Sequence, residues 1–234
     1  MEETDVVRAG FAMKRVSGYI LHGQAAFMHA GFAIVENMWD GDVRAAIRVA
    51  LTQCHSSSLA IEDETERVVE ELDLKSDFFF DLARTPALLE LSEALLGMAT
   101  IAIHIKFIRR TVLVAGDRWF RQNHYIHQDH FPYDAVSFTF PLTDDDGCYV
   151  NDYSVGRLHE VVEHEPLGDP EFGFGMSHMG AAFVTAYVPA GGCVAHHSFL
   201  PYRPSAQSFG SHGEFIVINY RQSPYRQRLR TEGA

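Results

Sequence analysis

Two residues near the middle of the chain have the types and the spacing of metal ligands. His127 and Asp129 lie two apart in a histidine-rich stretch between positions 122 and 133. On a β-strand, side chains two apart leave by the same face of the strand. An imidazole and a carboxylate that converge in this way provide two of the three ligands of a facial Fe(II) site, which keeps coordination positions open for a cosubstrate and oxygen. His-x-Asp alone is a weak motif, so further residues have to support it.

We expect the third ligand from a distant strand that the fold brings alongside the first two. The segment 190–205 is the candidate region, and it contains two adjacent histidines, His196 and His197. Neighbouring residues on a strand point to opposite faces, so at most one of these histidines can join the site. The alternative interpretation is one core histidine and one surface histidine.

The elements that would position these residues change in character at Gly97. Before it, we predict a short strand at 31–35, a helix at 42–53 and a second helix that ends at Gly97. Thr85 and Pro86 favour the start of this second helix, because threonine can cap a first turn and proline tolerates its missing N–H there. Glycine just after the last periodic residue is a common stop signal.

After Gly97, short β-rich runs alternate with turn sequences. The runs span 101–108, 136–142, 182–188, 193–197 and 215–221. Helices followed by many short strands predict a mainly β domain, a sandwich or barrel with a helical cover. An ordinary sandwich without a site would explain the strands equally well, so the function depends on the metal-binding residues.

The composition is that of a globular protein with no nucleic-acid or membrane partner. The 234 residues suit a single domain, and 47% of them are apolar and 21% charged, close to the average for soluble proteins. A formal net charge of −12 argues against binding to nucleic-acid phosphates. The sequence shows no membrane-length apolar run and no signal peptide. Three widely spaced cysteines indicate reduced thiols and a cytoplasmic location.

Six segments, in order, carry a resemblance to a known family. They are 31–37, 86–97, 127–129, 146–149, 154–159 and 190–197. Together they resemble the phytanoyl-CoA dioxygenase family of Fe(II)/2-oxoglutarate-dependent oxygenases over nearly the whole chain. The resemblance implies a double-stranded β-helix in a single domain, 1–234. Residues 1–100 would form a mostly helical cover, 101–222 the β-helix core and 223–234 a basic tail.

The resemblance also implies an activity. Fe(II) and 2-oxoglutarate would be the cofactors, and the protein would use molecular oxygen to hydroxylate an aliphatic C–H bond of a small molecule while 2-oxoglutarate becomes succinate. Phe131, Tyr133, Lys106 and Tyr202 are candidates for the substrate side of the site. Lys106 could attract an anionic substrate, and each of these residues could instead be an ordinary core or surface residue.

The sequence departs from the family at two positions. The distal iron ligand of the family is a histidine a short way beyond the position of His197, and this chain has Tyr202 there. An arginine that opens the last strand of the family pairs with the far carboxylate of 2-oxoglutarate. Here Gly213 and Glu214 occupy that region, preceded by His212. Glu214 would repel the cosubstrate if its side chain faced it.

These departures leave several interpretations open. In the favoured one, His197 completes the metal site, and Arg203 or His212 binds the cosubstrate. In the second, Tyr202 binds the metal as a phenolate, which suits ferric iron better than ferrous iron. In the third, the site is degenerate and the protein is a binding or auxiliary member of the fold. A 2-oxoglutarate-independent iron enzyme is a further alternative.

Overall fold

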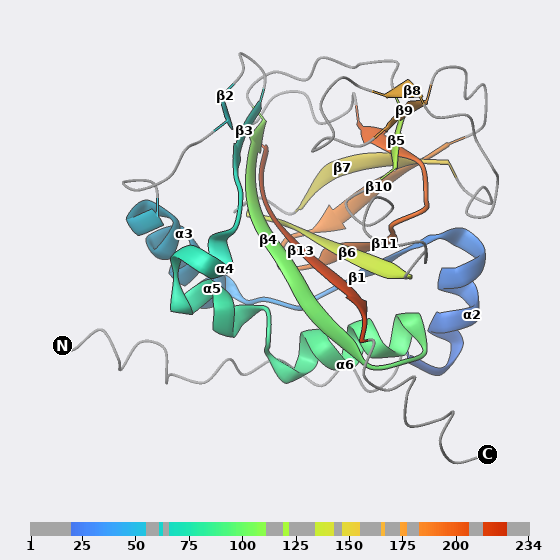
Figure 1. Ribbon diagram of the computed structural model, residues 1–234, viewed down its shortest axis with the longest axis horizontal. Helices are drawn as coiled ribbons and strands as arrows, with labels where there is room; N and C mark the ends of the chain where they lie inside the picture. The colour runs from blue at the N-terminus through green and yellow to red at the C-terminus, as the bar shows by residue number, and fades with distance from the viewer. Residues whose placement is uncertain are drawn as a thin grey trace.

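Two antiparallel sheets form the centre of the molecule (Figure 1). The computed structural model describes residues 20–54, 61–62, 66–110, 119–121, 134–142, 147–154, 165–166, 174–176, 183–205 and 213–223. The seven-stranded sheet has the order β1 (Phe32–Val35), β11 (Cys193–His197), β6 (Ala135–Pro141), β13 (Gly213–Gln222), β4 (Thr100–Arg110), β3 (Glu66–Val69) and β2 (Ile61–Glu62). The six-stranded sheet has the order β10 (Val184–Pro189), β7 (Gly147–Tyr153), β12 (Tyr202–Pro204), β5 (Trp119–Arg121), β9 (Phe174–Met176) and β8 (Glu165–Pro166).

Eight of these strands define the fold. The order β11-β6-β13-β4 lies within the seven-stranded sheet, and the order β10-β7-β12-β5 lies within the other. The chain therefore changes sheet at each step from β4 to β7, and again at each step from β10 to β13. This alternation is the double-stranded β-helix, so the predicted fold class is confirmed. The two sheets remain separate and do not close into one continuous barrel.

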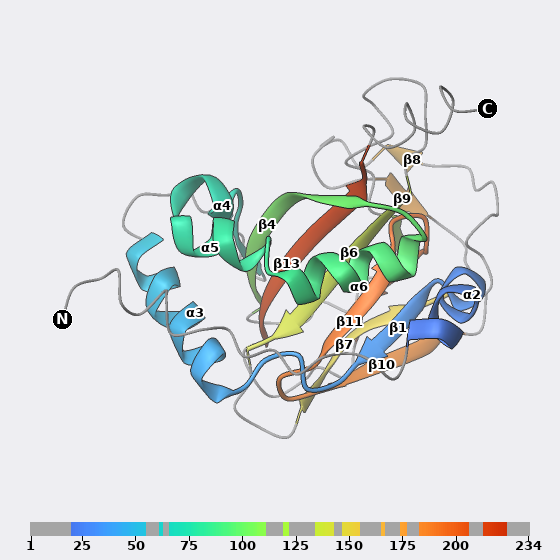
Figure 2. The same cartoon turned by 90° about the horizontal axis from the view of Figure 1, so that it is seen from below.

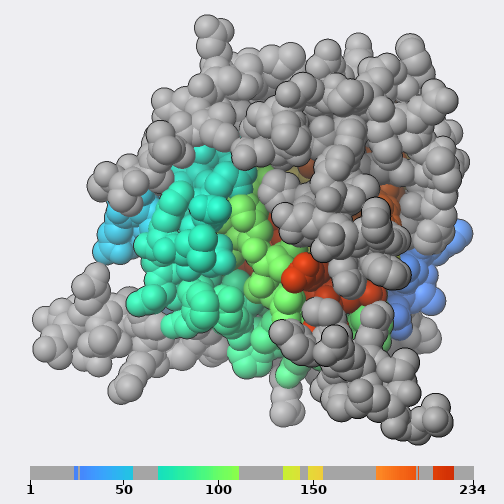
Figure 3. Space-filling view, viewed as in Figure 1, coloured from blue at the N-terminus to red at the C-terminus, as the bar shows by residue number. Residues whose placement is uncertain are grey.

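Helices cover the outer face of the seven-stranded sheet. They are α2 (Ile20–Ala30), α3 (Gly41–Cys54), α4 (Leu72–Lys75), α5 (Asp77–Leu82) and α6 (Pro86–Leu96). Helix α6 contacts β4, β6 and β13 and runs across them (Figure 2). On the face seen in Figure 3, side chains of α4 and α5 lie beside those of β4, and those of β13 appear on the other side of β4. None of the helices described is long and apolar enough to span a membrane.

The strands of the seven-stranded sheet send alternate side chains into two separate apolar clusters. On β13, Ile216 and Ile218 pack on the helix side, whereas Phe215 and Val217 pack between the two sheets. The inter-sheet cluster also contains Val150 of β7. Successive side chains of a strand point to opposite faces. Within a regular strand, residues with even numbers therefore face one side of the sheet and residues with odd numbers face the other. On β13 the even-numbered side chains meet the helices, whereas on β11 and the second half of β4 the odd-numbered ones do.

Helix α6 begins and ends where the sequence predicts, although one contact differs. Pro86 occupies its first turn, and Gly97 ends it with a φ of 72°, in the left-handed region that glycine adopts readily. Thr85 stands at the N-cap position, but its hydroxyl does not cap the helix. It donates instead to the carbonyl of Leu82, at 3.0 Å. The predicted strand at 31–35 and helix at 42–53 correspond to β1 and α3.

The first hundred residues contribute more to the sheet than the sequence predicts. Besides β1, the short strands β2 and β3 belong to this segment, and β3 pairs with β4 at the edge of the seven-stranded sheet. A helical cover is therefore an incomplete description of residues 1–100. Nearly all of the predicted basic tail, 224–234, lies outside the described residues.

The turn before β11 requires glycine. Gly191 has a φ of 76°, its carbonyl accepts a hydrogen bond from the Trp39 N–H at 2.8 Å, and a Cβ placed on it would lie 2.1 Å from the Trp39 carbonyl oxygen. The substitution Gly191→Ala should therefore lower the free energy of unfolding by at least about 2 kcal/mol, because it adds left-handed strain to a clash with backbone. Urea denaturation followed by circular dichroism measures this change.

Gly41 provides the matched control. It stands at the start of α3, and a Cβ there meets no atom within 4 Å. Alanine in place of this glycine should leave the stability unchanged or raise it slightly, since alanine restricts the unfolded chain. Equal effects of the two substitutions would contradict the described turn.

Candidate active site

The two adjacent histidines of β11 point in opposite directions, as predicted. His196 has the parity of Val194, which packs between the sheets, and His197 has the parity of Cys193 and Ala195, which pack under the helices. The pairing of β11 with β6 and β1 fixes this arrangement on both sides. Only His196 therefore reaches the space between the two sheets.

His196 is enclosed by aromatic rings and has one ring nitrogen that lacks a partner. Its side chain is buried, with ring centroids 5.1 Å from Tyr202 and 5.5 Å from Tyr153. The Tyr153 hydroxyl lies 3.4 Å from Nδ1. Within the part of the chain that the structure describes, Nε2 is buried and makes no hydrogen bond. Buried polar atoms are nearly always paired, so an orphaned ring nitrogen points to a missing ligand.

The environment of His196 keeps its imidazole neutral. Burial lowers the pKa of His196 to about 3, with smaller contributions from His197 and from the positive charge of Lys106. A neutral imidazole has one nitrogen with a lone pair, which is the form that binds metals. Because the Tyr153 hydroxyl can either donate or accept, Nδ1 can carry the proton and leave the lone pair on Nε2.

His197, the residue that the sequence favoured as the third ligand, lies on the helix side. Its ring contacts Phe27 of α2, at a centroid distance of 6.1 Å. Its Nδ1 accepts a hydrogen bond from the backbone N–H of Phe199 at 3.2 Å, and its Nε2 lies 3.3 Å from an Asp134 carboxylate oxygen. Because a backbone N–H can only donate, the Nδ1 lone pair of His197 is engaged by Phe199. The Nε2 of His197 is buried without a hydrogen bond among the described residues, like that of His196, but the parity of His197 places it on the helix side of β11.

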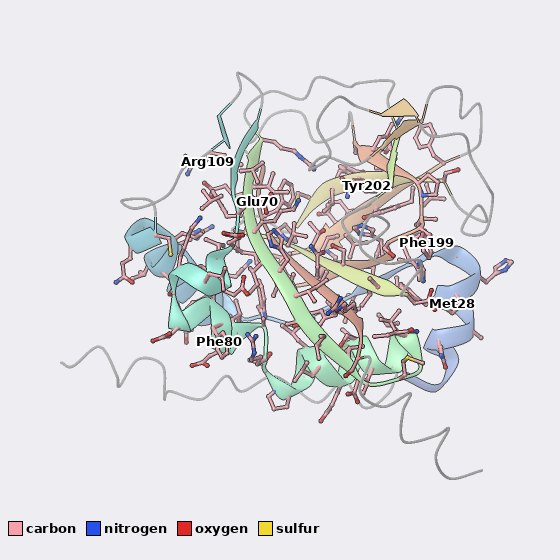
Figure 4. The ribbon with its side chains drawn as sticks, in the orientation of Figure 1. Met28, Glu70, Phe80, Arg109, Phe199 and Tyr202 are labelled. Carbon is pink, nitrogen blue, oxygen red and sulfur yellow. The ribbon has the colours of Figure 1, made fainter. Side chains whose placement is uncertain are left out.

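Tyr202 and Arg203, the two predicted site residues of β12, face opposite sides of the six-stranded sheet. Tyr202 pairs with Tyr153 across the sheet and lies beside its ring, at a centroid distance of 6.4 Å; Figure 4 shows Tyr202 among the strands of the six-stranded sheet. The next residue, Arg203, turns to the other face. Its Nε donates to Asp152 at 3.0 Å, and its guanidinium lies over the Phe183 ring. Arg203, expected to bind the cosubstrate, therefore does not face the same space as Tyr202.

A chain of polar contacts crosses the space between the sheets. Arg110 Nη1 of β4 donates a long hydrogen bond to Asn151 Oδ1 of β7, at 3.4 Å. Asn151 Nδ2 donates to the Tyr153 hydroxyl at 3.1 Å, and this hydroxyl meets His196 Nδ1. This series of contacts, called the polar chain below, links the guanidinium of Arg110 to the imidazole of His196. Its members come from strands of both sheets.

The acidic residue that could have repelled a cosubstrate faces away from this space. Glu214 has the parity of Ile216 and Ile218, on the helix side. Its carboxylate accepts a hydrogen bond from Arg109 Nε at 2.8 Å, and Figure 4 places Arg109 at the outer edge, near β3. The charge of Glu214 is therefore paired outside the space between the sheets. Lys106, a predicted substrate residue, lies 3.8 Å from a Glu70 carboxylate oxygen through its Nζ.

Several predicted site residues fall outside the described residues. They are His127, Asp129, Phe131, Tyr133 and His212, and their roles remain predictions. Over the described ranges, no group of three or more His, Cys, Asp or Glu side chains is placed to hold a metal ion. Of the two adjacent histidines, His196 is the one whose side chain lies between the sheets.

Sequence reasoning missed Arg110, Asn151 and Tyr153. One signal could have found Arg110, because it has the same parity as Lys106 and lies two residues beyond the predicted run 101–108, within β4. Asn151 and Tyr153 had no such signal, since their strand, β7, was not among the predicted runs.

Comparisons with known proteins identify the fold. No protein-family model matches the sequence, and no curated protein matches it either. The phytanoyl-CoA dioxygenase resemblance therefore stays a resemblance. Among solved structures, the epimerase SnoN in complex with iron(III), 2-oxoglutarate and nogalamycin RO aligns with a TM-score of 0.67 and 16% identity, over 87% of this chain and 83% of that one.

Two further solved structures align with this chain over a similar share of its length. EvdO2 from Micromonospora carbonacea var. aurantiaca, complexed with 2-oxoglutarate, aligns with a TM-score of 0.66 and 16% identity, over 90% of this chain and 93% of its own. HygX from Streptomyces hygroscopicus, with nickel and 2-oxoglutarate, aligns with a TM-score of 0.62 and 12% identity, over 87% of each chain. The chain therefore has the fold of the non-haem, 2-oxoglutarate-dependent enzymes.

The Tyr153 hydroxyl is the central link of the polar chain, which makes its contribution measurable. The substitution Tyr153→Phe leaves Asn151 Nδ2 and His196 Nδ1 without this partner in a buried site, so we expect a loss of about 1–3 kcal/mol in the free energy of unfolding. Tyr149→Phe is the control, since Tyr149 lies on the same strand but is exposed, and its effect should stay within about 0.5 kcal/mol. Similar losses of unfolding free energy in Tyr153→Phe and Tyr149→Phe would argue against the polar chain.

Proposed function

We propose that the protein is a non-haem Fe(II)/2-oxoglutarate-dependent dioxygenase that hydroxylates an aliphatic C–H bond of a small molecule. One observation carries the proposal. A double-stranded β-helix holds a buried, neutral histidine between its sheets, and the Nε2 of this histidine has no partner among the described residues. The solved structures that share the fold include complexes with 2-oxoglutarate together with iron or nickel.

We propose His127, Asp129 and His196 as the metal ligands. Two histidines and one carboxylate form the facial set that suits Fe(II) and leaves positions open. His196 replaces His197 in this set, because its side chain faces between the sheets and its Nε2 can present a lone pair. Iron bound there would supply the activation of oxygen, and 2-oxoglutarate would supply two electrons as it becomes succinate and carbon dioxide.

The described residues around His196 would orient the ligand and exclude water. The Tyr153 hydroxyl can accept the Nδ1–H of His196, which fixes the ring and raises the basicity of Nε2. Asn151 in turn holds the Tyr153 hydroxyl. The apolar side chains of Val194 and Leu200 are fully buried in the same inter-sheet cluster, and such surroundings strengthen electrostatic interactions and limit side reactions.

The substrate is proposed to be a small molecule. SnoN has been solved with nogalamycin RO, and HygX with hygromycin B, so this fold accommodates ligands of that size. Phe131, Tyr133, Lys106 and Tyr202 remain our candidates for the substrate side. Tyr202 has the firmest support, because its ring lies next to that of His196.

A catalytically degenerate binding protein is the second candidate. It is favoured by Tyr202, which stands at the position of the family's distal histidine, and by Gly213, which stands in the region of the family's arginine. In such a protein the metal or the cosubstrate would bind weakly or not at all.

Metal affinity tests the ligand set. Isothermal titration with Ni(II) should show at least roughly 10- to 100-fold weaker binding for His196→Ala. Loss of a residue that only hydrogen-bonds to a metal ligand already weakens metal binding by this factor. His197→Ala is the matched control from the opposite face of the same strand, and it should keep the metal affinity while losing stability. Tyr202→Phe should also keep the affinity.

Two other patterns would contradict this ligand set. A weaker affinity in Tyr202→Phe with no change in His196→Ala would assign the site to a phenolate. A weaker affinity in His197→Ala alone would restore the ligand favoured from the sequence. In a His127→Ala variant, an unchanged affinity would contradict every version of the site.

Succinate release tests the activity. Protein supplied with Fe(II), ascorbate, oxygen and 2-oxoglutarate should release succinate slowly without a substrate and faster when a panel of small molecules includes the right one. His196→Ala should abolish this release, and an incubation without iron gives the background. Tight metal binding with no succinate under any condition would favour a 2-oxoglutarate-independent enzyme, and absence of metal binding would favour the degenerate binding protein.

A further inference from the structure

The first residue of β13 faces the space between the sheets but has no side chain. Gly213 has the parity of Phe215 and Val217, which pack in the inter-sheet cluster. A Cβ added at Gly213 would lie 2.7 Å from Cε2 of the Phe215 ring. A longer side chain at this position would therefore have to displace that ring, so this position does not suit an anion-binding arginine.

An arginine stands directly opposite, on the neighbouring strand. Arg110 of β4 is the antiparallel partner of Gly213, and directly opposed residues of an antiparallel pair project from the same face. The guanidinium of Arg110 lies 5.2 Å from the centroid of the Phe215 ring. Its Nη1 reaches across to the carbonyl of Val150 at 3.3 Å and to Asn151 Oδ1.

We infer that Arg110 binds the carboxylate of 2-oxoglutarate that lies farthest from the metal, an inference that rests on the proposed function. A guanidinium has five N–H donors in a planar fork, which suits a bidentate contact with a carboxylate. Asn151 and Tyr153 connect Arg110 to His196. The proposed anchor for the far carboxylate and the proposed metal ligand thus lie at the two ends of one polar chain.

Arg203 and Arg109 do not face the space between the sheets. Arg203 is paired with Asp152 on the opposite face of β12. Lys106 has the parity of Arg110, and its Nζ lies 3.8 Å from a Glu70 carboxylate oxygen, so it is tested separately. Arg109, next to Arg110, faces the helix side and pairs with Glu214. Arg109 therefore has the same chemistry as Arg110 on the same strand, with the opposite orientation, and makes a matched control.

The test compares two keto acids that differ only in the far carboxylate. Nickel-loaded protein is titrated calorimetrically with 2-oxoglutarate and with 2-oxopentanoate, in which a methyl group replaces that carboxylate. The unaltered protein should prefer 2-oxoglutarate at least tenfold. Arg110→Gln should weaken 2-oxoglutarate binding roughly 10- to 100-fold, the loss expected for hydrogen bonds to a charged group, and leave 2-oxopentanoate binding unchanged. Arg109→Gln should preserve both affinities and the preference.

Binding of 2-oxopentanoate also reports that a variant is folded with its metal site intact. If Arg110→Gln does not fold, Arg110→Lys gives the same test, because lysine keeps the charge but loses the planar fork. That variant should retain part of the preference. A full preference for 2-oxoglutarate in either variant overturns the inference, as does loss of the preference in Lys106→Met or Arg203→Gln alone. Failure of the unaltered protein to bind either keto acid overturns the proposed function itself, and the inference with it.

Discussion

The register of the central strands β11, β6, β13 and β4 is the constraint on which the site depends. Because side chains alternate with a period of two, a slip of one residue would exchange every inward side chain for its neighbour. On β11 this slip would exchange His196 with His197, and on β4 it would exchange Arg110 with Arg109. A buried hydrogen bond of 2.6 Å from Ser137 of β6 to Asn219 of β13 helps to hold the register from inside the sheet pair.

The same register explains why polar groups persist between two apolar sheets. Buried polar atoms are costly unless each finds a partner, and a satisfied network rigidifies its surroundings. Asn151 and Tyr153 satisfy each other within the inter-sheet cluster, whereas His196 retains an Nε2 without a partner among the described residues. The polar chain is thus complete in its middle and open at the histidine, where a ligand would complete it.

Local sequence patterns predicted the elements that are long or clearly bounded, and missed those that depend on distant partners. Helix α6 was predicted from Pro86 and Gly97, and the opposite orientations of the two histidines followed from their adjacency. Strand β7 was missed because its sequence includes Asn151 and Asp152, which are poor strand formers and are stabilised here by contacts across and between strands. Arg203 and His212 were the predicted cosubstrate residues and Arg110 was not among them, because only the pairing of β4 with β13 places Arg110 opposite Gly213.

The two departures from the family have a common physical explanation if His196 and Arg110 act as proposed. In each case the expected residue is absent from its strand, at Tyr202 and at Gly213, and a residue of the same chemistry reaches the space between the sheets from another strand. A metal and a carboxylate require donors at given positions in space, and they do not require those donors to come from given positions in the chain. When a residue on another strand takes over a role, the fold is preserved but the sequence motif that identifies the family is lost. This accounts for a chain that aligns with known enzymes in structure but matches no family model in sequence.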